Sequence, residues 1–185
     1  MALTSALVPL LTPAPSFSLP DVSGVMHDLM DFADEAVVVV AFVCNHCPYV
    51  RHIEAELGRL AEEGGALFLG ICSNDADGYP EDSPDQLRAQ AARAGWSFPY
   101  LVDVEQTAAR DYGAVCTPDF FGYGPDRRLA YRGAFDNSTP SNGQPVNGSL
   151  LREAIALIAR GETVPEPHRP SMGCSIKWRT DSHPA

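Results

Sequence analysis

The chain has 185 residues and a formal net charge of −11, from 24 acidic and 13 basic side chains. This length suits one domain with a well-filled core, and the acidic surplus argues against nucleic acid and anionic membranes as partners. Five cysteines without repeated spacing argue against a secreted disulfide scaffold, and we find no signal peptide pattern or membrane-spanning run. We therefore expect one cytoplasmic domain over residues 1–185, with its core at about 15–160 and a tail at 161–185.

The N-terminal part of the chain predicts an irregular lead-in and one hairpin. Residues 1–15 are rich in proline and are expected to lie across the surface of the domain. A short strand at 17–19, a turn at 20–24 and a returning strand at 25–29 then predict an edge hairpin.

The stretch at 36–65 predicts a central strand followed directly by a helix. Eight consecutive apolar residues, AVVVVAFV at 36–43, are typical of a strand that helices cover on both faces. After them Val50, Ile53 and Leu57 recur at helical spacing, while Pro48 suits a first helical turn and two glycines at 64–65 end the helix.

Two cysteines in a C-N-H-C motif mark the junction between this strand and helix. We expect Cys44 to lie at the helix N-terminus, where unpaired N–H groups and the helix dipole favour a thiolate, and so to act as the nucleophile. Cys47 would resolve the mixed disulfide. A C-x-x-C next to a βαβ pattern predicts thiol–disulfide exchange, and His46 is expected to lower the pKa of Cys44.

Metal binding is an alternative use of the same motif. No second C-x-x-C or paired histidines follow, so the sequence does not complete a structural zinc site. A copper-carrier module would use Cys44, Cys47 and a histidine such as His46 or His52 as soft ligands. We otherwise expect no resident metal and no organic cofactor.

The rest of the chain predicts alternating strands and helices. A buried strand at 66–72 should run parallel to the first, since a helix makes the crossover. The acidic residues at 75–82 suggest a solvated loop, because their spacing does not fit a calcium loop. The remaining predicted elements are a helix at 84–94, an extended segment at 96–102, a short helix at 105–112, a hairpin at 119–123 and 128–132, a polar loop at 133–148 and a helix at 150–160.

This order of elements resembles the thioredoxin superfamily over about residues 15–160, an α/β fold with a central mixed sheet flanked by helices. Two motifs, CNHCPYV at 44–50 and PSMGCSIKW at 170–178, resemble the redoxin or peroxiredoxin-like (AhpC/TSA-like) thioredoxins. The resemblance implies that Pro118 is a cis-proline facing the dithiol and that Thr117 offers its backbone to an extended substrate strand. It also implies partners with protein thiols or disulfides, or a small thiol reductant.

The sequence lacks residues that are typical of peroxiredoxins and of thioredoxin. The threonine and proline that accompany a peroxidatic cysteine are missing, since Val37 and Ala41 occupy the positions before Cys44. Thioredoxin's tryptophan before the first cysteine is replaced by Val43. We therefore predict a thiol–disulfide oxidoreductase of oxidase or isomerase character, with an antioxidant thiol peroxidase as the alternative.

Two further cysteines are candidates for additional redox thiols. Cys116 directly precedes the Thr-Pro pair, and packing is the favoured interpretation of its role. Cys174 lies in the C-terminal tail and is the better candidate for a second resolving thiol.

Overall fold

A five-stranded mixed sheet forms the centre of the protein, in a computed structural model that describes residues 2–180. Its strands are β4 (Val38–Phe42), β5 (Leu67–Cys72), β6 (Tyr100–Val102), β8 (Asp119–Tyr123) and β9 (Leu129–Gly133). They lie in the order β6-β5-β4-β8-β9, with β4, β5 and β6 parallel and β8 and β9 antiparallel to their neighbours. The predicted central strand is confirmed as β4.

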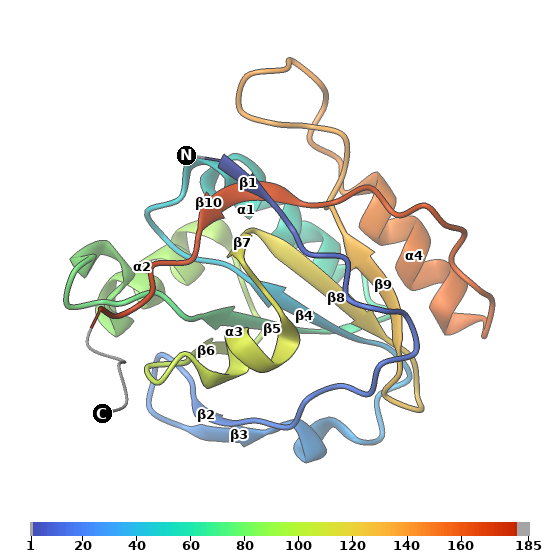
Figure 1. The fold of residues 1–185 in the computed structure, drawn as a ribbon, viewed down its shortest axis with the longest axis horizontal. Helices are drawn as coiled ribbons and strands as arrows, with labels where there is room; N and C mark the ends of the chain where they lie inside the picture. The colour runs from blue at the N-terminus through green and yellow to red at the C-terminus, as the bar shows by residue number, and fades with distance from the viewer. Residues whose placement is uncertain (1, 181–185) are drawn as a thin grey trace.

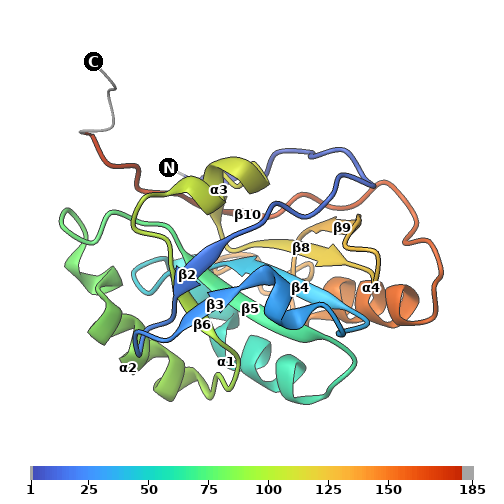
Figure 2. The same cartoon turned by 90° about the horizontal axis from the view of Figure 1, so that it is seen from below.

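Helices cover both faces of this sheet (Figure 2). One face packs against α1 (Pro48–Glu62), α2 (Pro84–Ala94) and α4 (Ser149–Ala159), while the other packs against α3 (Thr107–Tyr112) and the N-terminal segment. Alternate residues of β4 enter the two cores, so neither side of the strand meets water. The expected α/β architecture is therefore confirmed, and its continuous apolar run at 36–43 follows from burial on both faces.

Two small sheets complete the described chain. The expected edge hairpin is confirmed as β2 (Ser18–Pro20) and β3 (Met26–Asp28), which lies beside β6. The second small sheet has the order β1-β10-β7 and joins β1 (Ala2–Thr4), β10 (Met172–Ser175) and β7 (Cys116–Thr117). Two short 3₁₀ turns are η1 (Leu29–Phe32) and η2 (Pro80–Asp82).

The sheet β1-β10-β7 corrects two expectations about the ends of the chain. The irregular lead-in contains a strand, and the tail contributes the middle strand of a sheet that crosses the molecule next to α1 (Figure 1). No helix within residues 2–180 is long and apolar enough to cross a membrane.

Candidate active site

The C-N-H-C loop connects β4 to α1 and carries two fully buried cysteines. Cys44 and Cys47 each have 0% of their surface exposed. The helix begins at Pro48, and its N-cap is Cys47. The expectation that Cys44 lies at the helix N-terminus is therefore wrong. Cys44 precedes the N-cap by three residues, and Cys47 is the cysteine at the positive end of the helix dipole.

Thr117 contacts both sulfurs. Its Oγ1 lies 3.2 Å from Sγ of Cys44, and its carbonyl oxygen accepts a hydrogen bond from Sγ of Cys47 at 3.1 Å. The Thr117-Pro118 peptide bond is cis, as the resemblance implied. One residue of β7 thus holds the dithiol in place, from a part of the chain about 70 residues away.

Asp82 organises the other side of the loop and was not predicted. Its Oδ1 accepts the backbone N–H groups of Asn45 and His46 at 2.7 and 3.1 Å, and its Oδ2 accepts Nδ1–H of His46 at 2.5 Å. Asn74 donates to the same Oδ2 at 2.8 Å. The residue is 1% exposed, so the expectation of a fully solvated acidic loop is wrong at this position.

The electrostatics place the thiolate on the second cysteine. A hydrogen bond from the Cys44 thiol, together with backbone N–H groups of Val50 and Cys174, lowers the pKa of Cys47 to about 5. Burial, the hydrogen bond to Cys47 and the Asp82 carboxylate raise the pKa of Cys44. The expected lowering of the Cys44 pKa by His46 is therefore wrong: Nδ1 of His46 lies 4.0 Å from Sγ of Cys44 and donates to Asp82.

Burial would also raise the pKa of Asp82, but hydrogen bonds from His46 and Asn74 outweigh it and lower that pKa. The carboxylate therefore stays ionised beside the dithiol. A signal for this residue exists in the sequence. Asp82 follows β5, and the carboxyl ends of adjacent parallel strands meet at the same edge of the sheet, where β4 leads into the C-N-H-C loop.

Strand β10 occupies the position expected for a substrate strand. Cys174 pairs with Thr117 and Ser175 pairs with Cys116, both antiparallel. The chain's own C-terminal segment thus takes the backbone pairing that the resemblance assigned to a peptide partner. The expectation of an open substrate edge at Thr117 is wrong for the described conformation.

The other expected site residues differ in their relation to the dithiol. Cys116 is buried, with its Sγ 4.0 Å from the carbonyl oxygen of Pro118, and burial raises its pKa. This supports a packing role. His52 hydrogen-bonds with Ser138 at 3.1 Å.

A group of potential metal ligands exists at the site, but its membership differs from the expected one. The ligand atoms of Cys44, His46 and Asp82 all lie within 4.8 Å of one another, in a group that includes neither Cys47 nor His52. A set of one thiol, one imidazole and one carboxylate is typical of zinc, whereas the copper site expected from the sequence would be richer in sulfur.

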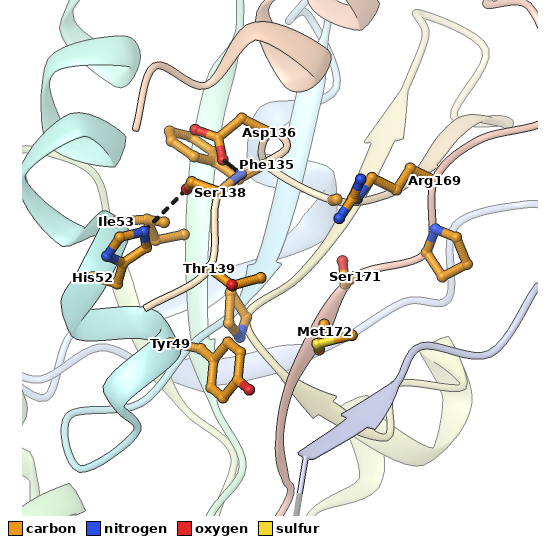
Figure 3. A pocket seen from close by; sticks show the side chains of 13 residues that line it. Tyr49, His52, Ile53, Phe135, Asp136, Ser138, Thr139, Arg169, Ser171 and Met172 are labelled. Atoms are coloured by element: carbon orange, nitrogen blue, oxygen red, sulfur yellow. Dashed lines mark hydrogen bonds between the residues drawn. The ribbon is translucent and has the colours of Figure 1, made fainter. Parts of the chain in front are cut away.

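A small hollow borders the site between α1, the loop after β9 and the segment leading into β10 (Figure 3). Tyr49, His52, Ser138, Arg169 and Met172 are among its lining residues, and Pro118 also borders it. Its cavity volume of about 30 Å³ has room for about two water molecules.

Comparisons with known proteins find two solved structures and one curated protein that are similar to this chain. An uncharacterized conserved protein from Geobacillus kaustophilus has a TM-score of 0.94 at 44% identity, covering 98% of each chain. A hypothetical protein from Sinorhizobium meliloti 1021 has a TM-score of 0.94 at 40% identity, covering 96% of this chain and 98% of that one. The thiol:disulfide interchange protein DsbE of Allochromatium vinosum is 34% identical over 113 residues, which span 59% of this chain and 58% of that protein.

More distant structures show the fold. The thioredoxin domain of a Bacteroides vulgatus thiol-disulfide oxidoreductase covers 80% of this chain at 14% identity, with a TM-score of 0.59. Peroxidoxin BcpB from Mycobacterium tuberculosis covers 82% at 19% identity, with a TM-score of 0.61. The thioredoxin fold is thereby confirmed. Residues 10–135, more than half of the chain, match the AhpC/TSA family, and the chain belongs to that family.

Proposed function

We propose that the protein is a thiol–disulfide oxidoreductase that exchanges disulfides with protein thiols or a small thiol through Cys44 and Cys47. The observation that carries this proposal is the contact of Thr117 with both sulfurs, at 3.2 and 3.1 Å, which holds two buried thiols beside one peptide group. The relationship to a thiol:disulfide interchange protein supports the same chemistry. The cytoplasmic location expected from the sequence stays a prediction.

The difference between the two pKa values suggests the order of steps. In the oxidised protein, a substrate thiolate attacks Sγ of Cys44, and Cys47 leaves as the thiolate because its pKa of about 5 makes it the better leaving group. A second substrate thiol then attacks the substrate sulfur of the mixed disulfide. The substrate leaves oxidised, and the proton of its second thiol ends on Cys44.

His46 and Asp82 have positioning roles in this scheme. The Asp82 carboxylate holds the backbone of the loop, and its charge adds to burial and the hydrogen bond to Cys47 in raising the pKa of Cys44. The ring of His46 stacks on Tyr79, with ring centroids 5.2 Å apart, and this contact helps to hold the imidazole beside Cys44. A stabilised Cys47 thiolate favours the reduced form, so the couple should be oxidising.

Equilibration in graded glutathione buffers, followed by counting of free thiols, tests the proposal. In Cys174→Ser, where this pair is isolated, we expect a Cys44–Cys47 couple with a potential clearly above the roughly −270 mV of thioredoxin, and we expect no such couple in the double variant Cys44→Ser, Cys174→Ser. A potential at or below that value would mean that the protein acts as a reductant and not as an oxidase or isomerase. The absence of any reversible couple would contradict the proposal itself.

A thiol peroxidase is the second candidate, and the match to the AhpC/TSA family favours it. A hydroperoxide would oxidise the Cys47 thiolate to a sulfenic acid. The Cys44 thiol would then condense with this sulfenic acid to form the disulfide and release water. Cys47 also lacks the accompanying threonine and proline, whose positions are occupied by Cys44 and Val40, and this counts against rapid turnover. Stopped-flow consumption of hydrogen peroxide by wild type and Cys47→Ser separates the two functions.

A further inference from the structure

The C-terminal strand β10 is built to lie against the dithiol. It pairs with β7 on one side and with β1 on the other, so its backbone is held along both edges. The segment after it is also anchored: Lys177 accepts the backbone N–H of Asp75 at 2.8 Å and donates its own to Asn74 at 2.8 Å. The strand is therefore an integral part of the site.

Gly173 allows an unusually close approach at this point. A Cβ at residue 173 would lie 1.8 Å from the carbonyl oxygen of Thr117, so no residue larger than glycine fits without a shift of the backbone. That carbonyl is the one that accepts the hydrogen bond from Cys47. The glycine therefore allows the backbone of β10 to lie directly against the Thr117 peptide group that binds Cys47.

The next residue along the strand is Cys174, which lies beside Cys47. Both the thiol and the backbone N–H of Cys174 interact with the Cys47 sulfur, and Cys174 packs against the core cluster that contains both site cysteines. Cys174 is also partly exposed, unlike the other four cysteines. The Cys47 sulfur thus lies between two thiols, those of Cys44 and Cys174.

We propose that Cys174 is a third redox thiol, which takes over the disulfide from Cys44 and covalently fastens β10 across the site. In the oxidised protein the Cys174 sulfur attacks Sγ of Cys47. The Cys47–Cys174 bond forms, the Cys44–Cys47 bond breaks, and the proton of Cys174 ends on Cys44. The step is an internal exchange that needs no further oxidant, and it rests on the proposed function because that function supplies the first disulfide.

The two outer thiols, Cys44 and Cys174, both carry a proton in the reduced protein. Burial and the neighbouring Cys47 raise the pKa of Cys174 to about 11, so it donates a hydrogen bond to Cys47 in the reduced protein. The raised pKa of Cys44 means that the released sulfur readily keeps a proton. The product would hold Cys44 as a single free thiol under a locked strand, a closed form of the protein.

Disulfide mapping of the full chain tests the proposal. The protein is oxidised in glutathione buffers, quenched with acid, alkylated, digested and analysed by mass spectrometry. We expect wild type to contain both Cys44–Cys47 and Cys47–Cys174 linkages. In Cys44→Ser we expect the Cys47–Cys174 linkage to dominate, with a glutathione adduct on Cys47 in less than about a tenth of molecules, because an intramolecular thiol has a high effective concentration.

Matched variants separate this proposal from its neighbours. Cys174→Ser should retain only the Cys44–Cys47 disulfide, and Cys116→Ser should map like wild type. A glutathione adduct on Cys47 in most Cys44→Ser molecules, or a Cys47–Cys116 linkage, would overturn the role of Cys174. The absence of a Cys44–Cys47 disulfide in both wild type and Cys174→Ser would instead overturn the proposed function. In that case the Cys47–Cys174 linkage in Cys44→Ser would still test the role of Cys174.

Discussion

The imidazole of His46 is joined to the carboxylate of Asp82 through Nδ1 and Oδ2 at 2.5 Å. The same carboxylate binds the backbone of the loop and adds a negative charge next to Cys44. The hydrogen-bonded pair of His46 and Asp82 therefore does not serve to make Cys44 a thiolate. It fixes the loop and disfavours a second negative charge beside the Cys47 thiolate.

Replacing this carboxylate by an amide should lower the pKa of Cys44. Asp82→Asn keeps an oxygen that can accept the two loop N–H groups but removes the charge. In a Cys47→Ser background, where one thiol of the pair titrates, we expect about tenfold more Cys44 thiolate at a given pH, which is one pKa unit. Alkylation rate against pH measures this. Glu81→Gln, an exposed neighbour, is the control, and equal profiles for both variants would contradict the prediction.

The thiolate of Cys47 should be visible directly. Its pKa of about 5 predicts that the ultraviolet absorbance of a thiolate in the reduced protein rises with a midpoint near pH 5. The hydrogen bond from Cys44 is the largest cause of that low pKa, so Cys44→Ala, which removes the donor, should shift the midpoint upward, and Cys174→Ala should shift it less. Cys47→Ser should lose this transition. A midpoint near pH 5 that persists in Cys47→Ser would assign the thiolate to another cysteine.

Displacement of β10 should expose the dithiol. Gly173→Ala places a Cβ against the carbonyl of Thr117, so the strand must move away from β7. Because both site cysteines are buried, we expect their modification by an aromatic disulfide reagent to become at least about tenfold faster. Gly124→Ala is the matched control, since its Cβ would meet no atom closer than 3.5 Å. Equal rates for the two variants would show that β10 does not limit access.

The sequence predicted the elements whose patterns are local. About 30 consecutive residues contain the apolar run of β4, the C-N-H-C motif and the helical spacing of α1. The spacing of apolar residues and the residues that end a helix were therefore sufficient to predict these elements. Asp82 could not be placed in this way. Its burial depends on the N–H groups of Asn45 and His46, which lie more than 30 residues away and become available only when the strands align.

Strand β10 was unpredictable for a related reason. The strand Met172–Ser175 is only four residues long, and it contains a glycine that a strand interior normally disfavours. What makes these residues a strand is pairing with β1, near the start of the chain, and with β7, which lies more than 50 residues before them. The PSMGCSIKW motif signalled that the tail matters, but its place over the dithiol required the tertiary structure.

Asp119, directly after the cis-proline, should make stability depend on pH. It is 1% exposed, its Oδ1 accepts the N–H of Phe120 at 3.1 Å, and its Oδ2 has no hydrogen-bond partner among residues 2–180. Burial raises its pKa to about 8, from an ordinary value of 3.8. The folded protein therefore holds the neutral acid at pH values where the unfolded chain is already ionised.

The sign follows from this raised pKa. The stability contributed by the buried neutral acid is complete below about pH 4 and is lost as the pH rises to about 8, at up to roughly 1.4 kcal/mol per pH unit. Asp119→Asn cannot ionise, so its free energy of unfolding relative to wild type should improve by about 2–5 kcal/mol between pH 4 and pH 8. Urea unfolding of both proteins across this range measures the difference. If the two stability curves run parallel, the side chain of Asp119 is not buried in its neutral form, which would contradict the prediction.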